Sequence, residues 1–350
     1  ARRTSSPVVF QSQPLDRRRP SVAEEVSRPP KPPELLGRAD AEQMIALARS
    51  AMVTRSRDLD AFAYANVDDV SLVDDRDGLQ FALIGMLPHR RFLLETQYGF
   101  LALKNGIPVS YGSIVGLFAS AEVAYTVFDT FRGSESARLY ARTLSMAANV
   151  FGCDTFVISP YQLGEDNEDA LASGAWWFYQ KLGYRPRDPK LLRLMKQETA
   201  KMARRAAHRS TMETLKRLAS GNIYLDLAPQ RDDVLGELDL ANVSLKIADS
   251  LAATCGSDRE KGLRQAAAEV ADVLEIDDVA SWSKLERAAW LQWAPLLSLM
   301  PTAARWSPEN KRAVADLVRA KAGRQELDYL RQFNRLRVLR EAVATLAQDG

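Results

Sequence analysis

Residues 127–137, VFDTFRGSESA, form the stretch of the chain whose residue types and order best fit a binding site. An apolar strand pattern ending at Val127 runs through a short loop into a helical pattern that continues to Val150. Free N–H groups and the positive end of a helix dipole meet at such a loop, so it can hold an anion such as a diphosphate. The alternative is an ordinary strand-to-helix turn, in which Ser134 or Ser136 caps the helix.

This stretch resembles the central strand and pyrophosphate loop of the GNAT superfamily of acyl-CoA N-acyltransferases, V-x-P-x-Y-R-G-x-G-x-G/A. The matching positions, from the strand end to the last small residue of the loop, are Val127, Phe131, Arg132, Gly133 and Ala137. Residues 177–184, WFYQKLGY, are similar to the family's F-Y-x-K-L-G-F signature. The resemblance covers residues 98–187.

The resemblance implies a V-shaped split between two parallel strands. The pantetheine arm of acetyl-CoA or another acyl-CoA would run along one edge of this split, with its phosphates on the loop. The implied cofactor-binding residues are Val127, Phe128, Arg132, Gly133, Ser134, Glu135, Ser136 and Ala137.

The resemblance also implies catalytic roles. Tyr179 is the implied general acid, because a phenol can protonate the departing thiolate. The family tends to use a carboxylate on the central strands as the base, so Glu122 and Asp129 are the candidates. The alternative for Tyr179 is a packing role in the Trp-Trp-Phe-Tyr cluster at 176–179.

Two positions depart from the family pattern. Glu135 stands where the family prefers glycine, and it places a negative charge where a diphosphate would approach. A second hypothesis for this loop is that the Glu135 carboxylate fills the anion site itself, because acidic groups stabilise helix N-termini. Ala172 stands where many family members have an asparagine that contacts the cofactor.

Two charged segments are candidate docking surfaces. The acidic residues Glu165, Asp166, Glu168 and Asp169 would attract a cationic amine acceptor, or they form a solvated loop. Residues 190–221 hold nine Lys and Arg residues against two Glu, which would suit a protein partner or an acyl carrier. No aromatic side chain is present there for stacking on bases, so nucleic acid is not an expected partner. The alternative is a helix with a solvated basic face.

The elements that must position these residues follow from the hydrophobic patterns. Short alternating runs at 79–131 predict strands, and Asn105 and Gly106 predict a tight turn in an antiparallel hairpin. A helical pattern then ends at Gly152, and one further strand and helix follow. Beyond Pro189 the patterns are helical and predict no strand. The predicted fold class is α/β, a GNAT-like mixed and mostly antiparallel sheet with flanking helices, plus an all-helical C-terminal domain.

The chain divides by composition into four segments. These are a proline- and arginine-rich extended arm at 1–38, a GNAT-like domain at 39–188, a basic linker helix at 189–221 and a helical domain at 222–350. The arm holds seven of the 16 prolines and few large apolar residues, so it cannot fold alone. Its alternative role is a strap docked on a partner or on the body of the chain.

The composition excludes several classes of protein. A length of 350 residues with 46% apolar content predicts at least two folded units. Two cysteines and two histidines exclude a disulfide framework and an ordinary Cys/His zinc cluster, so we expect no metal. No apolar run reaches the roughly 18 residues of a membrane span, so we expect a soluble protein, with the cytoplasm favoured.

Two functions remain open at this point. The first is an N-acyltransferase that moves an acyl group from an acyl-CoA or another thioester to an amine. The second is a non-catalytic GNAT-like module, whose helical domain and arm bind a protein partner as an assembly component.

Overall fold

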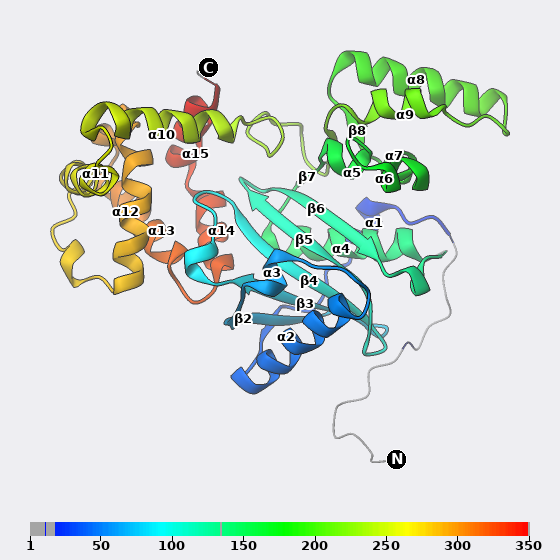
Figure 1. Ribbon diagram of the computed structural model, residues 1–350, viewed down its shortest axis with the longest axis horizontal. Helices are drawn as coiled ribbons and strands as arrows, with labels where there is room; N and C mark the ends of the chain where they lie inside the picture. The colour runs from blue at the N-terminus through cyan, green and yellow to red at the C-terminus, as the bar shows by residue number, and fades with distance from the viewer. Residues whose placement is uncertain (1–10, 12–17, 134, 349–350) are drawn as a thin grey trace.

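The computed structural model describes residue 11, residues 18–133 and residues 135–348. Within these residues, nine strands form one open sheet in the order β1-β2-β3-β4-β5-β6-β7-β9-β8 (Figure 1). Only β6 and β7 are parallel neighbours, so the mixed, mostly antiparallel sheet of the prediction is confirmed. The strands are β1 (Glu34–Leu35), β2 (Ala65–Asp74), β3 (Leu79–Met86), β4 (Thr96–Lys104), β5 (Ile107–Leu117), β6 (Ser120–Val127), β7 (Thr155–Ile158), β8 (Arg185–Pro186) and β9 (Ile223–Asp226).

The hairpin of β4 and β5 forms at the predicted turn. Lys104 pairs with Ile107, and the two residues between them have positive φ angles of 52° for Asn105 and 77° for Gly106. Both angles are those of a tight hairpin turn, which asparagine and glycine tolerate at low cost. The prediction of an antiparallel hairpin at this site is confirmed.

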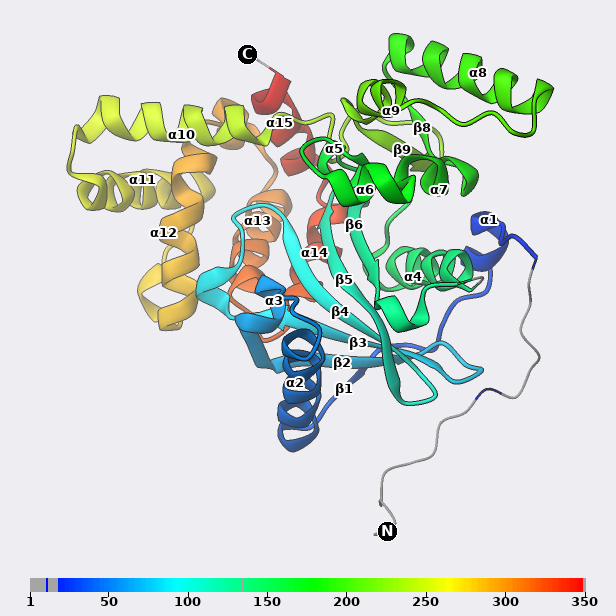
Figure 2. The same cartoon turned by 45° about the vertical axis from the view of Figure 1, so that its right-hand side comes forward.

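Helices cover both faces of the sheet. Helix α4 (Ser136–Phe151) places Tyr140, Leu144, Ala147 and Phe151 on one buried face, and it ends at Gly152 with φ of 71°, as predicted. Helices α2 (Arg38–Val53) and α3 (Asp60–Ala63) pack on the opposite face (Figure 2). The sheet is therefore the middle layer of three.

The prediction that no strand follows Pro189 was wrong. Strand β9 lies between β7 and β8 in the sheet, and the run Ile223-Tyr224-Leu225 was too short to stand out among helical patterns. The predicted single basic helix is a hairpin of two helices, α8 (Pro189–Arg204) and α9 (Met212–Ala219). This hairpin connects the neighbouring strands β8 and β9, so it is an insertion in the sheet.

The described end of the predicted arm lies on the body of the chain. Helix α1 (Val22–Val26) packs against α4, and β1 extends the sheet beside β2 (Figure 2). Pro20 and Val22 are buried, and the Glu25 carboxylate binds arginines of α4. Residues 18–37 therefore form a strap, in which α1 lies on the side that α4 covers and β1 lies at the edge of the sheet.

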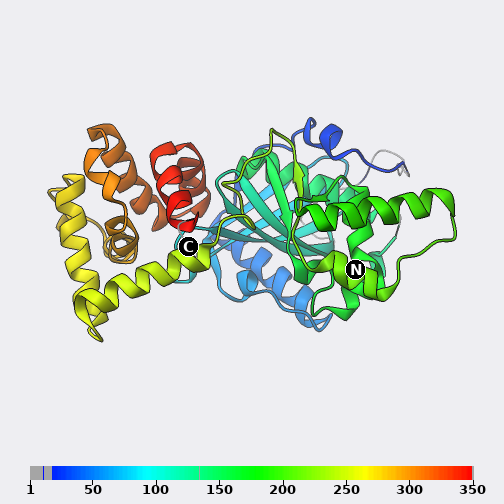
Figure 3. The ribbon, with the colours of Figure 1, turned by 90° about the horizontal axis from the view of Figure 1, so that it is seen from above.

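The C-terminal region is mostly helical and gathers at one end of the molecule, opposite the α8–α9 hairpin (Figure 3). Its buried residues belong to the same hydrophobic core as the α4 face of the sheet. Trp282, Trp290 and Trp293 are buried in this core. The helices are α10 (Leu240–Cys255), α11 (Arg259–Leu274), α12 (Lys284–Ser298), α13 (Pro308–Lys321), α14 (Glu326–Arg335) and α15 (Arg337–Gln348).

A buried group of charged and polar side chains joins this helical region to the sheet. We call Asp69, Arg91, Tyr98, Lys321 and Glu326 the junction network. Lys321 Nζ lies 2.5 Å from Glu326 Oε1, and Arg91 donates to the carbonyl of Lys321 at 2.7 Å. The Tyr98 hydroxyl donates to Asp69 at 2.9 Å, and the Glu326 N–H donates to the same carboxylate at 3.0 Å. The network connects β2, β4 and the start of α14.

The backbone makes room for this network. A bulge in β2 between Ala65 and Val70 shifts the register at Asp69, and the neighbouring strand has glycine at position 85. A Cβ at Gly85 would lie 2.2 Å from Asp69 Oδ2, closer than any two such atoms can approach. Gly85 is therefore required by the buried carboxylate.

Two further findings concern the described residues only. None of their helices is both long enough and apolar enough to cross a membrane. No group of three or more His, Cys, Asp or Glu side chains among them could hold a metal ion.

Candidate functional site

The parallel strands β6 and β7 separate soon after they meet. Their pairing covers Ser120 to Glu122 and Thr155 to Val157. Strand β6 then continues to Val127, whereas β7 ends at Ile158 and the chain turns into α5 (Pro160–Leu163). The sheet therefore opens between the carboxyl-terminal ends of these two strands, where a parallel pair leaves backbone groups without strand partners.

A cluster of tyrosine side chains lies beside β6. Tyr179, on α7 (Ala175–Lys181), is 5% exposed, and its ring packs against those of Tyr140 and Tyr184 at centroid distances of 5.5 and 5.7 Å. Tyr125 of β6 packs against Tyr140 at 4.9 Å. The hydroxyls of Tyr140 and Tyr184 share a hydrogen bond of 2.9 Å. The Tyr179 hydroxyl has no hydrogen bond within the described chain.

The charge of Glu122 acts on the phenol of Tyr179. Burial raises the pKa of the Tyr179 phenol well above its usual value, and the negative charge of Glu122 raises it further. The Glu122 carboxylate is half-buried and accepts a hydrogen bond from Gln162 Nε2 at 2.8 Å. At neutral pH this site therefore holds a protonated phenol, able to donate a proton, near a carboxylate that is held in place by an amide.

Asp129, the other candidate base, lies in a different place. It begins the 3-10 helix η2 (Asp129–Phe131), its side chain is 76% exposed, and it is ion-paired with Arg132 at 2.9 Å. Asp129 lines a small hollow of about 150 Å³ with Arg55 and Arg57 from the segment after α2. The structure brings Tyr179 and Glu122 together and does not bring Asp129 to them.

The other implied cofactor residues follow the course of the loop. Phe128 is buried, with Tyr111 stacked on its ring at 5.2 Å and the Arg55 guanidinium 4.2 Å from its centroid. Val127 is buried and lines the same hollow as Asp129, Ala137 packs on the core, and Ser134 lies outside the described residues.

Neither Glu135 nor Ser136 caps the start of α4 with its side chain. Glu135 is the N-cap residue, but its carboxylate makes no capping hydrogen bond, so the structure gives no support to a self-filled anion site. The Ser136 hydroxyl accepts a hydrogen bond from the Gly133 N–H at 3.3 Å instead of capping the helix. The first amides of α4 are thus not neutralised by either side chain, which leaves them suited to an anionic group.

A larger cavity of about 560 Å³ lies beside this end of α4. Glu135, Ser136 and Phe131 line one side of it, and the strap with α1 and the two hairpin turns after β2 and β4 line the others. Neither Tyr179 nor Glu122 contributes to this cavity or to the smaller hollow.

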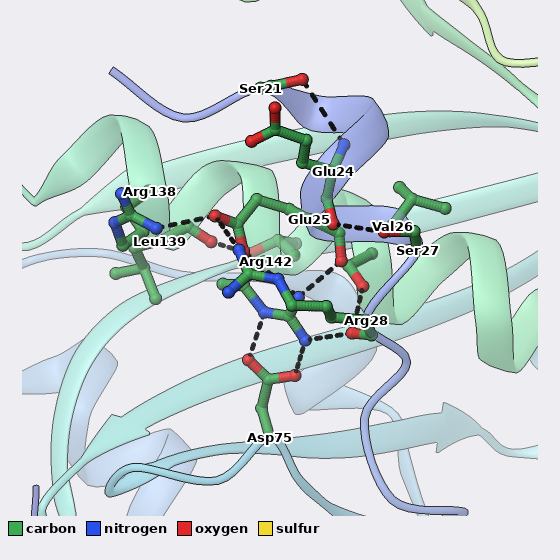
Figure 4. A network of polar contacts seen from close by, with 12 residues as sticks. Ser21, Glu24, Glu25, Val26, Ser27, Arg28, Asp75, Arg138, Leu139 and Arg142 are labelled. Carbon is green, nitrogen blue, oxygen red and sulfur yellow. Dashed lines mark hydrogen bonds and ion pairs between the residues drawn. The ribbon is translucent and has the colours of Figure 1, made fainter. Parts of the chain in front are cut away.

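An ion network holds the strap at the wall of the larger cavity (Figure 4). The buried Glu25 carboxylate lies 2.7 Å from Arg28, 2.7 Å from Arg138 and 3.3 Å from Arg142. Arg142 also binds Asp75, whose pKa is raised by burial, an effect that its hydrogen bond to Arg142 opposes. Sequence reasoning did not identify these residues, and only the spacing of Arg138 and Arg142 on one helical face could have drawn attention to them.

The acidic segment predicted to attract an amine covers the loop after α5 and the first turn of α6 (Glu168–Ser173). Its four carboxylate residues are all exposed, and Asn167 caps α6 by accepting from the Ala170 N–H. Helices α5 and α6, on either side of this loop, pack against α9 of the basic hairpin. Its attraction for a cationic amine stays a prediction.

The chain matches no protein-family model, no curated protein and no solved structure.

Proposed function

We propose that the chain is a GNAT-like N-acyltransferase, which moves an acyl group from an acyl-CoA or another acyl thioester to an amine. The observation that carries this proposal is the position of the Tyr179 phenol beside the Glu122 carboxylate, at an opening between parallel strands. The start of α4, which neither Glu135 nor Ser136 caps, follows β6 after η2 and a short loop, so an anionic carrier bound there could direct its thioester along β6.

In the proposed reaction, Glu122 and Tyr179 each transfer one proton. The amine nitrogen attacks the carbonyl carbon of the thioester, the C–N bond forms and the C–S bond breaks. Glu122, directly or through a water molecule, takes the proton from the attacking amine, and Tyr179 gives its proton to the departing thiolate. Backbone amides of β6 beyond Glu122 would polarise the carbonyl oxygen. Asp129 takes no part in this scheme, because it is exposed and paired with Arg132.

A second candidate function is a non-catalytic module for protein assembly. It is favoured by the closure of the site, because Tyr179 is buried and neither described cavity reaches it. The charge of Glu135 beside the start of α4 also opposes a diphosphate there. The helical region and the sheet share one core, so a partner would meet them as one rigid unit.

Calorimetry and turnover together decide between these functions. We expect saturable micromolar binding of acetyl-CoA and acyl transfer to small primary amines and polyamines. Replacing Tyr179 with Phe should lower turnover by about 100-fold or more while preserving CoA affinity, because only one proton donor is lost.

The control is Tyr184→Phe, since Tyr184 lies in the same cluster but its hydroxyl is bonded to Tyr140. This variant should lose some stability and keep most of its turnover. Unchanged turnover in Tyr179→Phe would remove the general-acid role. Absence of CoA binding and of transfer from any thioester tested would favour the assembly module.

A further inference from the structure

The α8–α9 hairpin concentrates the positive charge of the chain. Residues 190–221 hold nine of the 47 Lys and Arg residues but only two of the 45 Asp and Glu residues, a net charge of +7. The remaining 38 basic and 43 acidic residues give the rest of the chain a net charge of −5. All nine basic side chains are exposed: Lys190, Arg193, Lys196, Lys201, Arg204, Arg205, Arg209, Lys216 and Arg217.

The charges of α8 face outward. Lys190, Arg193 and Lys196 follow one another at three-residue intervals, on the side of the helix away from the buried Met195 and Glu198. The helix has 16 residues and is about 24 Å long, so its basic face is an extended stripe. Within the described chain, only Lys201 of the nine basic residues forms an ion pair, and that pair is with Glu198.

The hairpin presents this stripe on a rigid support. Glu198 is 2% exposed and accepts hydrogen bonds from Lys201 at 2.7 Å and from the Ser210 hydroxyl at 2.6 Å. His208 Nε2 lies 3.0 Å from the same carboxylate. We call these four residues the hairpin clamp. It fixes the turn between the helices to α8, so the hairpin loses little conformational entropy when a partner binds.

The surroundings of the stripe favour one class of partner. Residues 190–221 contain no Phe, Tyr or Trp, so the hairpin offers neither a stacking surface for bases nor aromatic anchors for a lipid interface. The exposed carboxylates of residues 165–169 lie in the loop after α5 and the first turn of α6, and both of these helices pack against α9 of the hairpin. A long polyanion that extended past the hairpin would be repelled there, whereas a protein can present an acidic face of limited length.

We propose that the outer face of α8 is a docking site for an acidic helix or surface patch of another protein. The acidic partner would carry Asp and Glu at intervals of three and four residues, matching the stripe over its 24 Å length, which is about that of 16 helical residues. This docking is independent of acyl transfer, since no residue of the proposed active site lies on α8.

The test uses the full chain and a synthetic helical peptide of about 16 residues, with Glu at intervals of three and four. We expect binding whose affinity falls steeply between about 50 and 200 mM salt, because the contacts are between exposed charges. The variant Arg193→Glu/Lys196→Glu should bind at least about tenfold more weakly. The control variant Arg259→Glu/Lys261→Glu makes the same charge change on α11, where both residues are exposed, and should bind like the parent.

A peptide with Gln in place of Glu should not bind. Tighter binding of a DNA duplex or of vesicles containing phosphatidylserine than of the acidic peptide, at about 150 mM salt, would overturn the proposal. It would also be overturned if Arg193→Glu/Lys196→Glu bound the peptide like the parent. Concentration-dependent dimerisation that this variant abolished would identify the partner as a second copy of the chain and contradict the proposal.

Discussion

Lys321 lies 2.5 Å from Glu326 with 6% of its side chain exposed, whereas Arg193 and Lys196 on α8 are exposed and pair with no acidic group in the described chain. In the junction network, Arg91 and Asp69 are likewise buried and surrounded by hydrogen-bonding groups. A buried charge without a partner costs several kcal/mol, so each member of the network depends on the others. Exposed cations have no such dependence, because water solvates them.

The buried charges of the junction network are needed for the fold, whereas the exposed charges of α8 are not. The junction network joins residues of β2 and β4 to α13 and α14, which are more than 200 positions apart in the sequence. Among the nine basic residues of the α8–α9 hairpin, only Lys201 forms an ion pair within the described chain. Loss of a network member should therefore weaken folding, and loss of a stripe member should weaken binding.

The largest expected effect is that of Glu326→Ala. This change removes the partner of Lys321 and leaves two buried cations, because Arg91 lies 3.9 Å from the other Glu326 oxygen. We expect the free energy of unfolding, measured by urea titration, to fall by about 3–5 kcal/mol.

The matched control for that prediction is Glu341→Ala on α15. Glu341 lies 2.6 Å from Arg337, but the two side chains are 60% and 86% exposed, so the change should cost at most about 0.5 kcal/mol. Equal effects of the two substitutions would show that burial does not distinguish the two kinds of ion pair.

The next effect concerns pH. Burial raises the pKa of Asp69 from 3.8 to about 6, although Tyr98, Arg91 and the Glu326 N–H oppose the shift. Between these values the folded chain holds a proton that the unfolded chain has released. The contribution of Asp69 to stability is therefore full below about pH 4 and is lost as pH rises through 6, a change of about 3 kcal/mol.

Asp69→Asn tests this sign. The free energy of unfolding of the parent chain and of the variant is measured at intervals from pH 4 to 7. As the pH falls, the parent chain should become more stable relative to the variant. A difference that stayed constant with pH would mean that Asp69 remains charged across the window.

The sequence predicts local features of the fold but not the junction network. The Asn105 and Gly106 turn and the Gly152 helix end depend on local backbone preferences, so the sequence alone predicts them. The junction network depends on contacts between distant segments, and neither Asp69 nor Glu326 belongs to any local pattern. The sequence does not predict the bulge in β2 at Asp69 or the need for glycine at position 85, because that need arises only from the contact between the two strands.

The candidate site was predicted in part for the same reason. Tyr179 and Glu122 lie on segments with clear helix and strand patterns, and the parallel pairing of β6 and β7 brings them together. The position of Asp129 depends on η2, a short turn that periodicity does not predict, so the sequence does not show that Asp129 lies away from Tyr179.

A smaller effect is expected at the hairpin clamp. Burial raises the pKa of Glu198, but hydrogen bonds from Lys201, Ser210 and His208 outweigh that effect and lower the pKa to about 2. Its stabilising contribution is therefore present above the usual glutamate pKa of 4.5 and is lost as pH falls through about 2.

Glu198→Gln keeps the shape of the clamp and removes its charge. We expect a loss of about 1–2 kcal/mol, because hydrogen bonds to a charged group are weakened but not all removed. Hydrogen exchange should quicken at residues 205–211 before it changes elsewhere. The control is Glu213→Gln on α9, an exposed carboxylate with no ion pair in the described chain, which should leave the exchange unchanged.

The smallest expected effect on stability is that of Arg193→Glu/Lys196→Glu. Both side chains are exposed, and neither forms an ion pair with an acidic side chain of the described chain. Reversing two charges also relieves repulsion within a segment of net charge +7. The free energy of unfolding should therefore change by no more than about 0.5 kcal/mol in either direction, while affinity for the acidic peptide falls. A loss above about 1 kcal/mol in urea titration would place these residues with the junction network, as charges that the fold requires.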